Sequence, residues 1–237
     1  MIVMITGASR GIGFETAKYF ARMKDVEIIA LSRNKAGLGR LAKECAAMEG
    51  NSVLHPVVFD LETFLSEPGI LRNVLPGHVT HIDILINNAG DLINKPFRDT
   101  SLEEIERIFR INVFAPSLLI RELLPLMGKQ DTTHVVNIGS MGGYQGSVKF
   151  PGLSIYSASK AALACLSECL NEEFKEGGIA FNCLALGSVQ TEMLEEAFPG
   201  YKAKLQPEEI AAFISNFALT AHRQMRGKVV PVALGNP

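Results

Sequence analysis

The sequence predicts one α/β domain over residues 1–237, with a parallel β-sheet of about seven strands and helices on both of its faces. Apolar runs of strand length alternate along the chain with segments of helical periodicity, and no linker, repeat or low-complexity tract interrupts them. Several runs, such as Ile82–Asn87, are nearly continuous in apolar residues, which is typical of strands that are covered on both faces. Together these two observations predict a doubly wound sheet.

The expected strands are short apolar runs at residues 1–5, 26–31, 53–59, 82–87, 134–138, 180–185 and 229–232. The expected helices lie between them, where apolar residues recur at helical spacing, at residues 14–21, 35–49, 64–74, 101–127, 156–176 and 207–220. In such a fold the carboxyl ends of the strands form one edge of the sheet, and ligands bind there.

A glycine-rich turn joins the first strand to the first helix. Thr6–Gly13 has the spacing Gly-x-x-x-Gly-x-Gly, whereas most dinucleotide-binding folds have Gly-x-Gly-x-x-Gly. Glycine lets the backbone approach a ligand closely, and the N–H groups at the start of a helix attract phosphate. Between a strand and a helix, the turn therefore predicts a nucleotide-binding site; the alternative is a tight turn without a ligand.

The charge and hydropathy of the chain exclude several classes of function. The 23 basic and 25 acidic residues give a net charge of −2, which argues against binding to nucleic acid or to an anionic membrane. No apolar run reaches the roughly 18 residues that cross a bilayer, and the first residues resemble a strand rather than a secretion signal. We therefore expect a cytoplasmic protein that acts on a small molecule.

The cysteine and histidine residues show no metal-binding spacing. The cysteines form no C-x-x-C pair and lie in apolar segments, so we expect buried free thiols at Cys45, Cys165, Cys169 and Cys183. The five histidines are scattered, with His78 and His81 in a loop before a strand. The sequence therefore predicts no metal site.

A tyrosine and a lysine lie about one helical turn apart in the segment Tyr156–Lys160. The i, i+4 spacing places the phenol and the ammonium group on one face of the expected helix. A nearby cation favours the phenolate, so we expect the pKa of Tyr156 to fall below its usual value of about 10. Such a tyrosine can act as a general acid–base near neutral pH. The alternative is a solvated surface pair.

Polar residues at the strand ends indicate a site close to this pair. Ser140 follows one apolar strand, and Asn87–Gly90 follows another at the same edge of the sheet. Asn112 lies inside the expected helix 101–127, where asparagine is unfavourable. We therefore expect Asn112 to serve the site, with a packed polar bridge as the alternative.

Together these motifs resemble the short-chain dehydrogenase/reductase family from about Ile2 to Leu234. Thr6–Gly13 matches the family's T-G-x-x-x-G-x-G, Asn87–Gly90 its N-N-A-G, and residues 186–191 resemble its P-G-x-x-x-T. The resemblance implies a Rossmann-type fold and a catalytic tetrad of Asn112, Ser140, Tyr156 and Lys160. The cofactor-binding residues that it implies are Gly7, Ser9, Arg10, Gly11, Ile12, Gly13, Asp60, Leu61, Asn88, Ala89, Gly90, Tyr156, Lys160, Gly187, Val189 and Thr191.

The resemblance also implies hydride transfer between a nicotinamide cofactor and a carbonyl or alcohol substrate. Ser140 and Tyr156 would hydrogen-bond the substrate oxygen, and Tyr156 would donate the proton during reduction. Lys160 would lower the pKa of Tyr156 and hold the nicotinamide ribose, while Asn112 would hold a water molecule. The alternatives are a non-catalytic dinucleotide sensor on the same fold, and a sugar-nucleotide epimerase or dehydratase, whose longer substrate region does not fit into 237 residues.

The end of the second expected strand predicts NADP(H) rather than NAD(H). In this fold, an Asp or Glu about 20 residues after the glycines binds the ribose 2′-hydroxyl of NAD. Ser32 occupies that position here, and Arg33 and Arg10 can approach a 2′-phosphate. Guanidinium groups suit phosphate because they donate two parallel hydrogen bonds. The alternative is that Arg33 is a solvated strand-end residue and that Arg10 caps the turn.

Two segments near the expected site depart from the family pattern. A substrate loop at about 141–155 is enlarged by residues 145–152, and a lid at about 192–206 is short. Leu186 replaces the usual proline before Gly187, which loosens the turn but leaves the cofactor contacts. For these reasons the substrate cannot be inferred from the resemblance.

One expected helix also predicts self-association. Residues 157–170 are apolar on nearly every face, so this helix must be buried on more than the side that covers the sheet. The helix at 101–127 is its expected companion across a two-fold axis, as in related enzymes. The prediction is a homotetramer or a homodimer.

Overall fold

The computed structural model describes residues 1–67, 69–129 and 133–234. Its seven strands form one sheet in the order β3-β2-β1-β4-β5-β6-β7, and all neighbouring strands are parallel. The strands are β1 (Ile2–Thr6), β2 (Glu27–Ser32), β3 (Val53–Val58), β4 (Ile84–Asn87), β5 (Thr133–Ser140), β6 (Ile179–Leu186) and β7 (Lys228–Val232). The predicted doubly wound α/β fold is confirmed.

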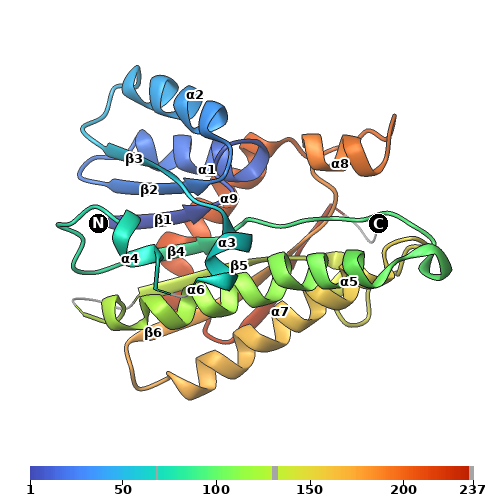
Figure 1. The fold of residues 1–237 in the computed structure, drawn as a ribbon. Helices are drawn as coiled ribbons and strands as arrows, with labels where there is room; N and C mark the ends of the chain where they lie inside the picture. Colours follow the sequence, from blue (N-terminus) through green and yellow to red (C-terminus); the bar gives the residue numbers. More distant parts are fainter. Residues whose placement is uncertain (68, 130–132, 235–237) are drawn as a thin grey trace.

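Helices cover both faces of this sheet (Figure 1). On one face lie α1 (Gly11–Ala21), α2 (Lys35–Ala46) and α9 (Pro207–Thr220), and on the other lie α6 (Ala115–Leu123) and α7 (Ser154–Glu173). The remaining α-helices of the described residues are α3 (Leu61–Ser66), α4 (Leu71–Val74), α5 (Leu102–Phe109) and α8 (Glu192–Ala197). None of the helices in the described residues is both long and apolar enough to cross a lipid bilayer.

Neighbouring residues of β2 belong to two separate apolar cores. Ile28 lies in the core that contains Phe20 of α1 and Ile214 of α9. Ile29 lies in the opposite core, together with Leu119 of α6. Because successive side chains of a strand point to opposite faces, a strand covered on both sides needs apolar residues at every position. This need explains the continuous apolar runs in the sequence.

The predicted helix at 101–127 is interrupted. After α5 ends, a π-helical turn spans Arg110–Phe114, and α6 follows it. Pro116 has no N–H group to donate to the carbonyl of Asn112, four residues earlier, so an α-helical hydrogen bond is missing next to the π turn. The turn contains Asn112, and single π turns within helices frequently mark functional sites.

The predicted helix at 64–74 is also wrong as one element, because α3 and α4 replace it. Gly69 lies between them with a φ of +94°, a left-handed conformation that no α-helix can continue through.

The prediction of buried cysteines is wrong for half of them. Cys45 and Cys183 are buried, whereas Cys165 and Cys169 are exposed on α7. These two thiols share one face of the helix with the exposed residues Ala158 and Ala161. This chain alone therefore leaves a small, weakly polar face of α7 uncovered.

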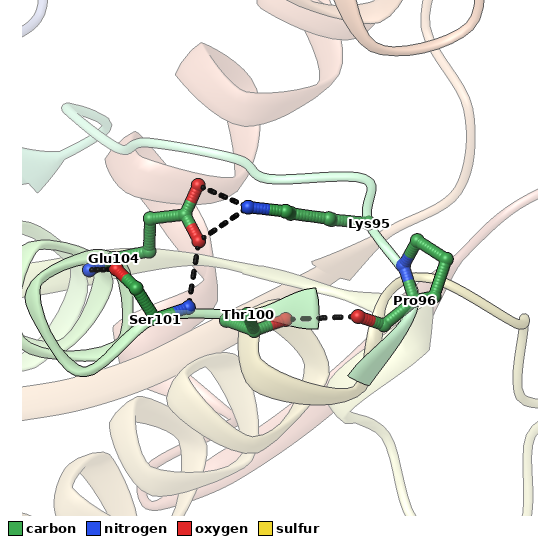
Figure 2. A network of polar contacts seen from close by, with 5 residues as sticks. All are labelled: Lys95, Pro96, Thr100, Ser101 and Glu104. Atoms are coloured by element: carbon green, nitrogen blue, oxygen red, sulfur yellow. Dashed lines mark hydrogen bonds and ion pairs between the residues drawn. The ribbon is translucent and has the colours of Figure 1, made fainter. Parts of the chain in front are cut away.

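A polar network fixes the segment between β4 and α5 (Figure 2). Ser101 Oγ accepts the N–H of Glu104 at 3.3 Å, and the Glu104 carboxylate accepts the N–H of Ser101 at 2.8 Å, which together form a capping box. Lys95 Nζ donates to both oxygens of the same carboxylate at 3.0 and 2.9 Å. The Lys95 N–H also donates to the carbonyl of Gly152 at 3.0 Å, so the network reaches the predicted substrate loop.

Candidate active site

The glycine turn follows the carboxyl end of β1, and its backbone conformation requires glycine. Gly7 and Gly11 have φ values of +68° and +55°, which other residues rarely adopt. A Cβ atom on Gly13 would lie 2.5 Å from both Asn88 Nδ2 and the Gly7 carbonyl oxygen. A side chain at this position would therefore push the turn away from the end of β4.

Asn88 and Ala89 tie the end of β4 to this turn. Asn88 Nδ2 donates to the carbonyl of Thr6 at 3.0 Å. Thr6 Oγ1 accepts the backbone N–H groups of Asn88 and Ala89 at 3.1 and 3.0 Å. The ends of β1 and β4 meet where the strand order reverses, which is the expected ligand position in a doubly wound sheet.

Ser9 and Ser32 form a hydroxyl pair beside the turn. Ser32 Oγ donates to Ser9 Oγ at 2.8 Å, so the position predicted to contact the adenosine ribose carries two hydroxyl groups and no carboxylate. Arg33 is exposed at the end of β2. Arg10 forms an ion pair with Glu196 of α8, a contact between the turn and the predicted lid that the sequence did not indicate.

Ser140 and Tyr156 meet at the carboxyl end of β5. Ser140 ends the strand, and its Oγ accepts the N–H of Gly142 at 3.2 Å, while Tyr156 lies in the first turns of α7. Burial raises the pKa of Tyr156 above its usual value of 10.0, because desolvation disfavours the phenolate, and the nearby Ser140 side chain opposes this effect. The predicted lowering of this pKa is therefore wrong for this structure.

Lys160 is buried beside Tyr156, and burial also shifts its own pKa. Its Nζ lies 5.9 Å from the centre of the Tyr156 ring and donates to the carbonyl of Ile138 at 2.8 Å. Only 5% of the residue is exposed, and burial lowers the pKa of Lys160 from 10.5 to about 8. The i, i+4 spacing brought the two residues to one site, but burial raises the pKa of Tyr156 and lowers that of Lys160.

Asn112 is buried in the π turn and connects two parts of the site. Its Oδ1 accepts the N–H of Asp91 at 2.8 Å. Its Nδ2 donates to the Asp91 carbonyl at 2.9 Å and to Ser159 Oγ, next to Lys160 in the chain, at 3.0 Å. A Cβ atom on Gly90 would lie 3.3 Å from both Asn112 Oδ1 and Lys160 Nζ, so all three residues surround one point.

The other predicted cofactor residues lie at the same edge of the sheet. Asp60 and Leu61 begin α3, with Asp60 Oδ1 accepting the N–H of Glu62 at 2.9 Å. Gly187 follows β6 and donates its N–H to Val232 at 2.9 Å, without the proline that usually precedes it. The remaining three residues are Val189, which bridges to Leu205, Thr191, which caps α8, and Ile12 of α1, whose carbonyl accepts a hydrogen bond from Thr16 Oγ1 at 2.7 Å.

Sequence reasoning missed Lys149, which holds the enlarged substrate loop together. Its Nζ donates to the carbonyls of Gly142 and Tyr144 at 2.9 and 2.6 Å and to Ser147 Oγ at 3.0 Å. These acceptors belong to the segment that directly follows Ser140. A lysine in a loop carries no signal of such contacts, because any exposed lysine has the same local pattern.

We expect Lys149→Met to lower kcat/KM for a carbonyl substrate by roughly tenfold, because hydrogen bonds from a charged donor are lost and the loop loosens. NADPH affinity should stay within about twofold, since the hydrogen bonds of Lys149 go to residues 142–147 and not to the glycine turn. Steady-state kinetics and a fluorescence titration measure the two quantities. Lys175→Met removes a lysine at the far end of α7 as the control, and equal kinetics in both variants would contradict the role of Lys149.

The parallel sheet, the glycine turn and the cluster of Ser140, Tyr156 and Lys160 agree with the family that the sequence motifs resemble. Residues 1–202 match the family described as short chain dehydrogenase. The chain belongs to this short-chain dehydrogenase/reductase family, as the sequence motifs indicated.

Two similar proteins carry functional names. Ketoacyl reductase HetN of Nostoc sp. is 36% identical over 187 residues, which cover 79% of this chain and 63% of that protein. An NADP-dependent 3-hydroxy acid dehydrogenase of Schizosaccharomyces pombe is 33% identical over 229 residues, covering 92% of this chain and 86% of that protein. This chain thus spans less than two thirds of HetN but most of the yeast enzyme.

Solved structures have the same fold. The complex of RhlG from Pseudomonas aeruginosa with NADP has a TM-score of 0.84 and 27% identity, covering 99% of this chain and 95% of that one. The 3-ketoacyl-(acyl-carrier-protein) reductase of Brucella melitensis, complexed with NADH, has a TM-score of 0.81 and 25% identity, with coverage of 99% and 97%.

Proposed function

We propose that this chain transfers hydride between NADP(H) and a small carbonyl or alcohol substrate, with Tyr156 as the general acid–base. The observation that carries the proposal is the position of the buried Lys160, whose Nζ lies 5.9 Å from the centre of the Tyr156 ring and donates to the carbonyl of Ile138, two residues before Ser140. This cluster lies at the same edge of the sheet as the glycine turn. A panel of carbonyl compounds with NADPH, followed at 340 nm, tests it.

The residues at this edge fit a dinucleotide. The close approach of Gly13 to Asn88 and Gly7 leaves no room for a side chain at Gly13, so the backbone at the start of α1 is open to a pyrophosphate. Gly11 and Gly13 would hold the pyrophosphate, Ser32 the adenosine ribose, and Lys160 and Thr191 the nicotinamide end. When bound, the cofactor supplies or accepts the hydride.

The side chains of the protein donate one proton and stabilise the negative charge that develops on the substrate oxygen. During reduction, negative charge grows on the substrate oxygen, where the hydroxyl groups of Ser140 and Tyr156 donate hydrogen bonds. The raised pKa of Tyr156 keeps the phenol protonated at neutral pH, as a proton donor needs to be. Protonated Lys160 then stabilises the phenolate that remains, and Asn112 keeps Asp91 and Ser159 in place around it.

The hydroxyl pair and Arg10 support NADP(H) as the preferred cofactor. Ser9 and Ser32 place no carboxylate where it would repel a 2′-phosphate. Arg10 has a carboxylate partner in Glu196, so it is already positioned to bind an anion at the end of the turn. A 2′-phosphate and Glu196 would therefore compete for this guanidinium group.

Glu196→Gln is expected to tighten NADPH binding by about two- to fivefold, because exposed ion pairs contribute about 0.2–1 kcal/mol and this one holds Arg10 away from the phosphate. NADH affinity should not change, since NADH has no 2′-phosphate. Fluorescence titration of both cofactors measures the effect. The neighbouring variant Glu195→Gln is the control, because Glu195 pairs with Lys202 instead. Equal tightening toward NADH, or none toward NADPH, would contradict the competition.

The names of the relatives favour particular first substrates. A ketoacyl reductase and a 3-hydroxy acid dehydrogenase are among the similar proteins, so 3-oxo acyl thioesters and 3-hydroxy acids are the compounds to test first. We also propose that the protein works in the cytoplasm, without nucleic-acid or membrane partners, which its net charge of −2 supports.

We further propose that the protein is a homodimer or homotetramer that pairs α7 and α5 across a two-fold axis. The uncovered face of α7 and exposed apolar side chains at Leu102 and Phe114 support this arrangement. Light scattering at micromolar concentration should give a multiple of 25.8 kDa, the mass of one chain. Ala161→Glu should shift the mass toward the monomer, and a monomeric wild type would end the proposal.

A further inference from the structure

Three potential metal ligands converge at the edge of the sheet opposite the candidate active site. Glu27 begins β2, His55 lies in β3, and His78 lies in the segment 75–81 before β4. Figure 1 draws this edge on the left, near the N-terminus. The parallel register pairs Glu27 with Val53 and Ile29 with His55, so Glu27 and His55 project from the same face of the sheet. Sequence analysis did not indicate this cluster, because its three members are far apart along the chain.

The potential metal-binding atoms of these three side chains lie close together. His55 Nε2 lies 2.9 Å and His78 Nε2 lies 2.5 Å from the same oxygen, Glu27 Oε1. The two imidazole rings are 5.6 Å apart between centroids, and one donor atom from each of the three residues lies within 4.8 Å of the others. This is the one such group of three metal-binding side chains in the part of the chain that the structure describes.

His55 supplies a second, independent observation. Its Nε2 is shielded from solvent, yet it finds no hydrogen-bond partner among the described residues, although Glu27 Oε1 is close. His55 Nε2 therefore has a carboxylate oxygen within 2.9 Å but no hydrogen bond, and native structures usually satisfy a shielded nitrogen with a protein group, water or an ion. A metal ion bound between His55 and Glu27 would satisfy this nitrogen.

We propose that Glu27, His55 and His78 bind a divalent transition metal ion of the zinc class. Two imidazoles and one carboxylate are a common zinc ligand set, with bonds of about 2.0–2.2 Å, and imidazole nitrogen disfavours Mg²⁺ and Ca²⁺. Ligand atoms of a tetrahedral site lie about 3.3 Å apart, so the three side chains need only small rotations outward. His78 has 60% of its side chain exposed and is free to make this adjustment.

The location predicts what the metal does. The three ligands come from β2, β3 and the segment before β4, so a bound ion would clamp the amino-terminal edge of the sheet. The predicted cofactor and substrate groups lie at the carboxyl edge, on the other side of the fold. The metal therefore stabilises the fold and takes no part in hydride transfer, and this inference does not depend on the proposed function.

Calorimetric titration of chelator-treated protein with Zn²⁺ tests the proposal, together with the melting temperature. We expect one bound ion per chain and a melting temperature about 5–10 °C higher at a hundredfold excess over Kd, with no response to Mg²⁺. His78→Ala and Glu27→Gln should each weaken zinc binding by about tenfold or more. His78→Ala is the sharper variant, because an exposed side chain can be removed without unfolding the protein.

His81→Gln is the matched control. His81 lines the same surface pocket but does not belong to the group of three donor atoms, so zinc affinity should stay within about twofold. NADPH affinity should be unchanged in every variant. Absence of zinc binding would overturn the proposal, and so would equal zinc affinity in wild type and His78→Ala. The second result would place the ion elsewhere, for example on the exposed thiols of Cys165 and Cys169.

Discussion

Tyr156→Phe is expected to lower kcat for carbonyl reduction by about 10²–10⁴-fold, which is the usual contribution of general acid–base catalysis. The variant removes the proton donor but keeps the aromatic ring, and the buried Lys160 stays beside it. NADPH affinity should therefore stay within about twofold of wild type. Steady-state rates at 340 nm and a fluorescence titration of NADPH measure the two effects separately.

Tyr19→Phe is the matched control for this variant. Its hydroxyl donates to Asn216 Oδ1 at 3.2 Å, on the face of the sheet covered by α1 and α9, so its loss should leave the rate unchanged. A Tyr156→Phe rate within tenfold of wild type would contradict the assignment. An equal loss in Tyr19→Phe would indicate a general effect on the fold.

Lys160→Met is the second large expected effect, because this lysine serves both the proton and the cofactor. We expect kcat/KM for reduction to fall by about 10²-fold or more and the Kd for NADPH to rise roughly tenfold, since a charge-assisted hydrogen bond contributes about 1.5–3 kcal/mol. Methionine keeps the length of the side chain, so the buried space beside Ile138 stays filled. A lower rate with unchanged NADPH affinity would show that the ribose contact is wrong.

The pH profile gives this lysine a second test. Its pKa is lowered to about 8 by burial, so the ammonium form that stabilises the phenolate is present below that pH and lost above it. In the wild type, kcat/KM for reduction should fall by about tenfold per pH unit above pH 8. The Lys160→Met profile should lack this fall. A fall that persists in the variant would assign it to another group.

The fold could be predicted because its signal is spread over the whole chain. The helix at 207–220 coincides with α9 at both ends, since Pro207 occupies its first position and Gln206 and Glu209 form a capping box. The π turn could not be predicted, because the sequence pattern shows a periodic helix and only the geometry around Pro116 reveals the interruption.

For the site residues, too, local features could be predicted from the sequence, whereas features that depend on the folded structure could not. Local spacing brought Tyr156 and Lys160 together, but the direction of their pKa shifts depends on burial, which the sequence does not give. Contacts between side chains that are far apart in the sequence could not be predicted. Arg10 meets Glu196, and Glu27 meets His55, only because the lid and two neighbouring strands bring them together.

We propose above all that the cluster of Ser140, Tyr156 and Lys160 reduces a carbonyl group with NADPH. The most direct measurement is NADPH consumption at 340 nm with a panel of ketones, aldehydes and 3-oxo acyl thioesters, alongside NADPH binding by fluorescence. We expect NADPH to bind and at least one compound to oxidise it in one-to-one stoichiometry with alcohol formation. NADPH binding without turnover of any carbonyl or, in the reverse direction, alcohol would contradict the account and indicate a dinucleotide sensor.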